Sequence, residues 1–115
     1  MSKEKARAHF LGQHGHKKLN CGQTIIKAFQ EKFSLSDETI SLFERYGGGQ
    51  APDGHCGAFY AAKIIMKDRY PEKLDECEKV LLTHAGSTKC KNIRSSRKLT
   101  CIGCVEKVAE SLENI

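Results

Sequence analysis

The sequence feature that most restricts the possible folds of this chain is a glycine-rich stretch that ends in a cysteine. Gly47-Gly48-Gly49, Pro52 and Gly54 cannot form a regular element, so the backbone before Cys56 must turn tightly or pass close to another segment. The run 58–66 that follows is apolar on nearly every face and predicts a central buried helix. We expect Cys56 at the first residue of that helix, where the helix dipole favours a thiolate. The alternative is a small buried cysteine that only packs.

Composition narrows the class of protein. A chain of 115 residues is most simply one domain with one core. Its net charge of +5 is a mild excess of basic side chains. Because the N-terminus has no secretory signal and no long apolar run occurs, we expect a soluble, cytoplasmic protein that does not contact a membrane. In a reducing compartment, six cysteines indicate metal binding or redox chemistry rather than a disulfide framework.

Helical signals recur along the chain and no alternating strand pattern appears. Asn20 is a good N-cap, and apolar positions at helical spacing follow it as far as Phe33. Ser36 and Pro71 begin further helices, and Gly86 ends one. We predict an all-α fold, a compact bundle of five to seven short helices with no sheet. Residues 1–19 form an N-terminal extension or weak helix, and residues 20–115 form the cysteine-containing helical domain.

Most of the cysteines fall at predicted helix starts. These are Cys21, Cys56, Cys90 and the pair Cys101 and Cys104. The helix dipole lowers a thiol pKa at such positions, and basic residues around Cys90 and Cys101 act in the same direction. In a bundle, helix ends can converge and present three or four thiolates to a metal or cluster. Cys77 differs, because it lies in the middle of an apolar stripe and indicates core packing.

The motif Cys101-Ile102-Gly103-Cys104 places two sulfurs within reach of one metal or of each other. A zinc ribbon would need a second such motif, and a thioredoxin site would need neighbouring strands; the sequence has neither. Conventional hydrolase motifs are also missing. His55 could serve as a base for Cys56, but sequence neighbours at a helix start usually point apart.

Segment 89–104 is basic and contains no acidic residue. Its five basic side chains are Lys89, Lys91, Arg94, Arg97 and Lys98. Because no aromatic residues are interleaved with them and no reading motif occurs, we interpret the segment as a solvated surface and do not expect nucleic-acid binding.

The chain resembles the C-GCAxxG-C-C family of redox-active proteins. The resemblance rests on Asn20-Cys21-x-Gln23, the glycine loop that leads to Gly54-His55-Cys56-Gly57-Ala58, Gly86-Ser87-Thr88-Lys89-Cys90, and Cys104-Val105 in the last helix. Two departures occur: the glycine follows Cys56 rather than preceding it, and Ala61 replaces the final glycine of the pattern. Cys104 matches the last cysteine of the pattern, and Cys101 is an addition to it.

The resemblance implies a small helical protein with redox-active or cluster-binding cysteines. Our leading hypothesis is that Cys21, Cys56, Cys90 and Cys104 gather as ligands of an iron-sulfur cluster or as a thiol-disulfide set, with Cys101 as a substitute ligand or a resolving thiol. Family members include selenocysteine proteins, and the family resembles an iron-sulfur domain of split-Soret cytochromes. Covalent haem is not expected, because Val105 rather than histidine follows Cys104.

Two classes of function follow. In the first, the chain is a redox protein, either an electron carrier or a thiol oxidoreductase that uses Cys56, Cys101 and Cys104 for thiol-disulfide exchange. Its partner would be a redox protein that the sequence does not identify. The sequence also leaves open whether the protein forms a homodimer. In the second, four cysteines bind a structural zinc ion that stabilises a helical interaction module.

Overall fold

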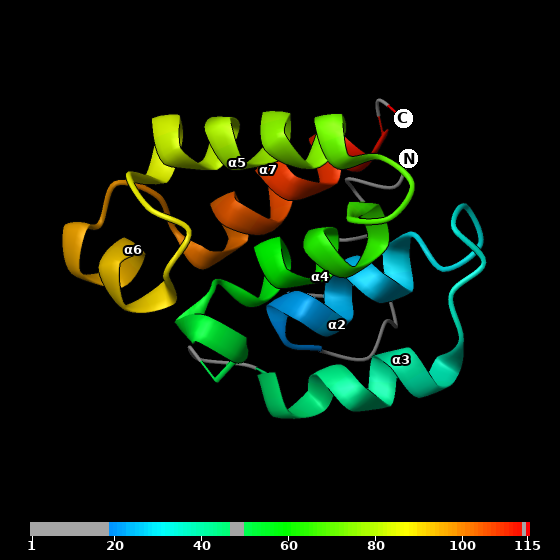
Figure 1. Ribbon diagram of the computed structural model, residues 1–115. Coiled ribbons are helices and arrows are strands. Elements are labelled where there is room, and N and C mark those ends of the chain that lie inside the picture. Colours follow the sequence, from blue (N-terminus) through cyan, green and yellow to red (C-terminus); the bar gives the residue numbers. More distant parts are fainter. Residues whose placement is uncertain (1–18, 47–49, 114) are drawn as a thin grey trace.

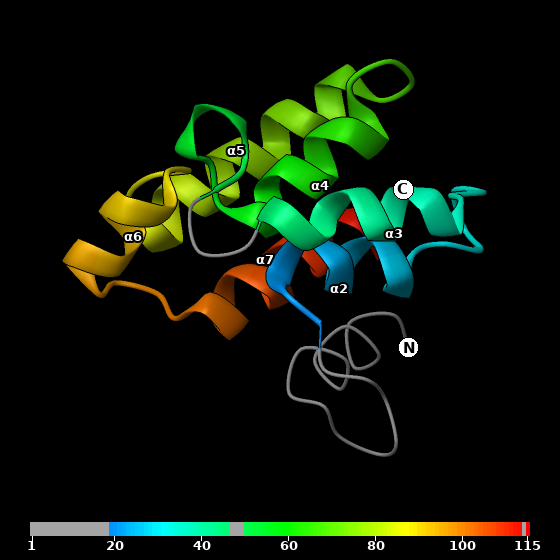
Figure 2. The same ribbon diagram turned by 90° about the horizontal axis from the view of Figure 1, so that it is seen from below.

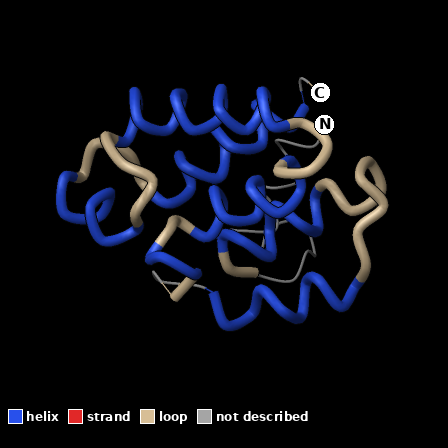
Figure 3. The backbone as a smooth tube through the Cα atoms, viewed as in Figure 1, coloured by secondary structure: helices blue, strands red, loops and turns tan. Residues whose placement is uncertain are grey.

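The computed structural model describes residues 19–46, 50–113 and 115, and within these ranges the chain is helical (Figures 1 and 3). The α-helices are α2 (Cys21–Ala28), α3 (Asp37–Leu42), α4 (Gly57–Met66), α5 (Pro71–Ala85), α6 (Cys90–Ser96) and α7 (Cys101–Glu113). Two short 3-10 helices, η1 (Phe43–Tyr46) and η2 (Pro52–Gly54), lie between α3 and α4. The only extended pairing in these ranges is an isolated bridge between His55 and Lys89. The predicted all-α bundle without a sheet is confirmed.

The predicted helix boundaries are confirmed at several points. Ser36 caps α3 by accepting a hydrogen bond from Thr39 N, and Pro71 is the first residue of α5. Gly86 ends α5 with a φ of 80°, a left-handed conformation in which glycine has no steric penalty. The predicted weak helix before residue 19 and the glycines at 47–49 lie outside the described residues.

Two boundaries differ from the prediction. Helix α2 ends at Ala28, so Phe33 belongs to the turn that follows; its ring packs against Phe29 and Tyr70, with centroids 6.1 and 6.2 Å apart. The helical spacing of apolar residues up to Phe33 therefore indicated which side chains pack against the core, but not where the helix ends. Helix α4 begins at Gly57, and Cys56 is its N-cap rather than its first residue. The cap position has non-helical backbone angles, with φ −53° and ψ 131°, because the chain enters the helix from the bridge at His55.

Helix α4 is the centre of the bundle, as its apolar sequence predicts. Seven of its 10 residues are buried, and it packs against α2, α5 and α7. Figure 2 shows α3 across α2, and α6 at one end of the molecule between α5 and α7. The largest fully buried side chains are Phe29, Phe43, Ile25, Ile26, Met66, Leu81 and Leu112. Each such side chain contributes roughly 1.5–3 kcal/mol through burial, so the core holds the helix starts in place.

Candidate functional site

The start of α2 is fixed by hydrogen bonds on both sides. The Asn20 side chain accepts from Gln23 N at 2.8 Å, and Gln23 Oε1 accepts from Asn20 N at 3.3 Å, which completes a capping box. Asn20 Nδ2 also donates to the carbonyl oxygens of Phe43 and Glu44, at 2.8 and 3.1 Å. These bonds anchor the half-buried Cys21 at the first residue of α2, next to η1.

Two glycines allow α2 and α4 to meet closely at their N-terminal ends. A Cβ atom at Gly57 would lie 3.2 Å from Gly22 N and 3.7 Å from Cys21 Sγ. A Cβ atom at Gly22 would lie 2.6 Å from the Phe43 ring, which real side chains do not tolerate without a shift. The missing side chains therefore bring Cys21 beside the start of α4. This is the structural role of the glycine that follows Cys56 in this chain.

The segment before α6 brings Cys90 towards Cys56. Cys56 N donates to Thr88 O at 2.7 Å. The neighbouring residues His55 and Lys89 form an isolated antiparallel bridge. Lys89 Nζ donates to Asp53 O at 2.7 Å and fastens the same two segments together. Because Cys90 follows Lys89 directly, these bonds place the start of α6 against the start of α4.

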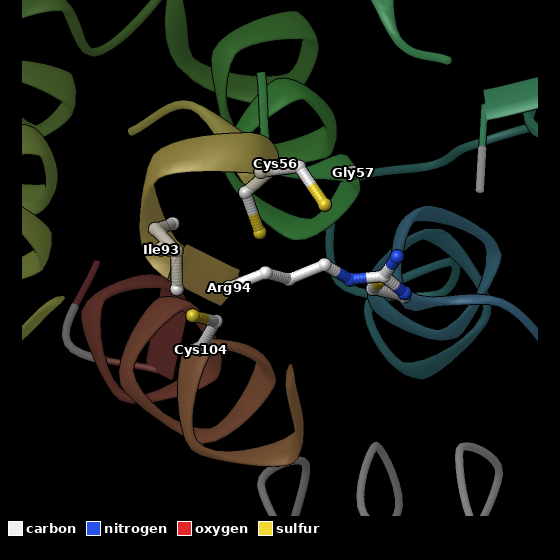
Figure 4. A pocket seen from close by; sticks show the side chains of 7 residues that line it. Cys56, Gly57, Ile93, Arg94 and Cys104 are labelled. Carbon is white, nitrogen blue, oxygen red and sulfur yellow. The ribbon is translucent and has the colours of Figure 1, made fainter. Parts of the chain in front are cut away.

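The four cysteines of the family pattern line one pocket. Its walls are Cys21, Cys56, Gly57, Cys90, Ile93, Arg94 and Cys104, and its cavity volume is about 20 Å³. Four helices contribute, since α2, α6 and α7 each provide one cysteine and Cys56 caps α4. In Figure 4 the Arg94 side chain extends across the pocket that Cys56 and Cys104 line. The convergence expected of helix starts in a bundle is thus present.

Comparison with known proteins identifies the family of this chain. The model of the family described as "Putative redox-active protein (C_GCAxxG_C_C)" matches residues 19–115. The chain belongs to this family. No curated protein and no solved structure matches the chain. Membership supports a redox role for the protein. The four cysteines that the sequence resemblance matched to the family pattern are those that line the pocket.

Cys56 does not have the lowered pKa that its position at a helix start predicts. A hydrogen bond with the Cys104 thiol, burial and the nearby charge of a Cys104 thiolate hold the pKa of Cys56 well above its ordinary value. Backbone N–H groups of Phe59 and Ala58 act in the opposite direction, as a helix start should, but they do not prevail. Cys56 is 5% exposed and Cys104 is 1% exposed. The prediction that the helix start lowers the pKa of Cys56 is wrong, because burial and the second thiol outweigh the helix dipole.

Cys77 lies apart from the pocket walls, in the core as predicted. It is 1% exposed in the middle of α5 and forms a hydrogen bond with the Ser111 side chain of α7. Burial raises the pKa of Cys77 to about 11, although the bond to Ser111 lowers it. This thiol therefore stays protonated at neutral pH.

His55 is not positioned to act as a base for Cys56. Its Nδ1 atom is 3.2 Å from Thr88 Oγ1, and its ring packs edge-on against Phe59 with centroids 5.2 Å apart. Burial and the positive charges of Lys89 and Lys63 lower the pKa of His55. The side chain thus fastens the segment before α6 and does not line the pocket.

The part of the chain that the structure describes contains no group of three histidine, cysteine, aspartate or glutamate side chains already placed to hold a metal ion. Cys101 is the first residue of α7, but its side chain lies outside the described residues. Cys104, one turn later, lines the pocket. No described helix is both long and apolar enough to span a membrane.

Sequence reasoning missed the other walls of the pocket. Arg94 was included only in a solvated basic segment, yet it is four residues after Cys90 and so shares a helix face with it. That spacing could have identified it. The carbonyl of Thr88 and the close approach at Gly57 depend on which segments lie side by side, and no local pattern reports such contacts.

Proposed function

We propose that this protein binds an iron-sulfur cluster through Cys21, Cys56, Cys90 and Cys104 and transfers electrons. The observation that carries the proposal is the convergence of these four cysteines, from distant parts of the chain, on one pocket. Four thiolates are the number that two-iron and four-iron clusters require. Thiol exchange would need only two of them, so the set of four favours a cluster.

Burial of the thiols supports the role of ligands over that of nucleophiles. A cysteine that attacks disulfides needs solvent access and a lowered pKa, and Cys56 has neither. A ligand has no such requirement, because a metal ion deprotonates the thiol that coordinates it. The Cys56 and Cys104 thiols can therefore be buried and protonated in this state and still act as ligands.

Arg94 adds the charge that such a site needs. Four thiolates bring negative charge into a largely apolar pocket, and the Arg94 guanidinium lies on its wall. Positive charge and hydrogen bonds near the ligands raise the reduction potential of iron-sulfur sites. When bound, the cluster would supply reversible electron transfer. Arg94 would compensate the thiolate charge, and Ile93 would keep water away.

The four cysteine thiols suit an iron-sulfur cluster, but the cavity between them is too small to hold one in this conformation. About 20 Å³ holds roughly one water molecule, so the pocket must widen to accept a larger group. Half-buried Cys21 and Cys90 lie on its more accessible side, and α6 has only one buried residue, Ile93. We therefore expect the pocket to open through a displacement of α6.

The test is to purify the protein without oxygen, record its visible spectrum, and measure iron, sulfide and zinc. We expect iron and sulfide in equal amounts and a colour that dithionite bleaches. Stoichiometric zinc without iron would instead support the structural zinc site. A protein that contains no metal, and cannot be reconstituted with iron and sulfide, would contradict both.

A second candidate function is supported by the hydrogen bond between Cys56 and Cys104. Two thiols in contact can reduce an external disulfide: one sulfur bonds to the other, and the external disulfide accepts two electrons and two protons and leaves as two thiols. This alternative predicts a loss of about 2 Da from the chain when a disulfide oxidises the metal-free protein. Peptide mapping would then find Cys56 linked to Cys104.

Several predictions from the sequence stay predictions. These are the cytoplasmic location, the redox partner protein, the homodimer, the role of Cys101 as a substitute ligand or exchanging thiol, and catalysis of an oxidoreductase reaction.

A further inference from the structure

A second and larger cavity adjoins the cysteine pocket. It is lined by Ile93, Arg94, Arg97, Leu99 and Thr100, and its volume is about 310 Å³. Ile93 and Arg94 belong to the walls of both cavities. This volume is at the lower end of the range found for small-molecule sites. The cavity is therefore large enough for a small organic ligand, unlike the cysteine pocket.

The walls of this cavity are held by the end of α6 and the start of α7. Arg97 ends α6 with a φ of 57°, and its backbone N–H donates to Ile93 O at 3.1 Å. Leu99 packs so closely on Gly103 that a Cβ atom there would lie 2.6 Å from Leu99 Cδ1. Thr100 Oγ1 accepts from Gly103 N at 3.0 Å. The glycine of the Cys-x-x-Cys motif thus shapes this cavity.

The wall chemistry selects the ligand. Two of the five lining residues are arginines, one is a threonine with a hydroxyl group, and none is acidic. A guanidinium group matches the geometry of carboxylate and phosphate and can bind either through two hydrogen bonds. Ile93 and Leu99 provide an apolar side for a short carbon chain. Exposed Lys91 and Lys98 add positive charge on the same segment, which attracts anions from a distance.

We propose that this cavity binds a small organic anion that carries carboxylate or phosphate groups on a short carbon skeleton. Arg97 binds the charged group and Thr100 donates its hydroxyl hydrogen, while Arg94 adds positive charge on the wall that the two cavities share. The proposal goes beyond the cluster and does not depend on what the cysteines hold. Since Arg94 also lines the cysteine pocket, the ligand would lie directly beside the redox centre.

The test is isothermal titration calorimetry of the full chain at low ionic strength, with citrate as the carboxylate probe and glycerol 3-phosphate as the phosphate probe. Glycerol is the neutral control. We expect saturable binding of at least one anion and none of glycerol. Arg97→Asn should weaken that binding about tenfold or more, because a charged hydrogen-bond partner is lost. Asparagine tolerates the left-handed conformation at this position, so helix content should not change.

Lys91→Gln is the matched control, since it removes the same charge from α6 but lies outside the cavity walls. The proposal is overturned if neither anion binds, if glycerol binds equally well, or if Lys91→Gln weakens binding as much as Arg97→Asn does. Because these measurements do not involve the cysteines, a protein that contains no cluster can still confirm the anion site.

Discussion

Cys56 and Cys77 are both buried thiols with raised pKa values, yet the structure gives them different neighbours. Cys56 caps α4, contacts Cys104 and lines a pocket with two further cysteines. Cys77 lies in the middle of α5 and is hydrogen-bonded to the Ser111 side chain. Burial and pKa therefore do not distinguish the proposed ligand Cys56 from the packing residue Cys77 in this molecule. The difference lies in position, because helix starts converge at one end of the bundle while the middle of α5 faces the apolar core.

The largest effect should come from the core around Cys77. Leu81→Ala should lower the free energy of unfolding by about 2–5 kcal/mol, because Leu81 is 1% exposed and its loss leaves a cavity. Leu82→Ala is the control on the same helix, since Leu82 is 44% exposed and should change stability by only about 0.5 kcal/mol. Urea denaturation measures both. Equal effects would mean that this face of α5 is not the core.

The next largest effect should arise where α2 meets α4. Gly22→Ala should cost about 1–3 kcal/mol, because its Cβ would lie 2.6 Å from the buried Phe43 ring. Helix propensity alone would favour alanine there by up to about 1 kcal/mol, so the sign of the change separates the two effects. Denaturant unfolding measures it, with exposed Ser41→Ala in α3 as control. A stabilised Gly22→Ala variant would contradict the close crossing.

The protonation of Cys77 should appear in the pH dependence of stability. The pKa of Cys77 is about 11 when folded, so the unfolded chain ionises first and stability falls as pH rises above about 8.5. At pH 10 this thiol should account for a loss of about 1–2 kcal/mol relative to neutral pH. Cys77→Ser removes the titration and should show a correspondingly smaller loss. Parallel curves for the two proteins would show that the thiol is not buried.

The smallest effect compares two helix caps. Asn20→Ala should cost about 1–2 kcal/mol, since Asn20 caps α2 and also bonds to two carbonyl groups of η1. Ser36→Ala removes an exposed cap of α3 and should cost about 0.5–1 kcal/mol. Thermal unfolding measures both. If the order is reversed, the bonds to η1 do not stabilise the start of α2.

Much of this fold follows from local sequence signals. Asn20, Ser36, Pro71 and Gly86 determine where helices begin or end through their own backbone and side-chain chemistry, and all four act as predicted. Cysteines at helix starts could likewise be read from the sequence. Their convergence on one pocket depends on contacts between distant segments, such as Cys56 N with Thr88 O, which no local pattern encodes.

The pKa of Cys56 shows most clearly what local sequence signals cannot predict. From sequence, its position at a helix start predicts a lowered pKa, and the backbone N–H groups of Ala58 and Phe59 do act in that direction. The Cys104 thiol, which reverses the sign, comes from a helix that begins 45 residues later in the chain. Arg94 was visible in the sequence but acquired a role only when α6 was placed beside Cys56.

The most direct test of the central claim is the iron and sulfide content of Cys56→Ser and Cys77→Ser, purified without oxygen beside the unaltered protein. Both substitutions exchange one buried sulfur for oxygen, so they perturb packing in a similar way. We predict that Cys56→Ser loses most of its iron and the dithionite-sensitive colour, while Cys77→Ser keeps both. Equal iron content in the two variants would contradict the assignment of the four-cysteine pocket as the redox centre.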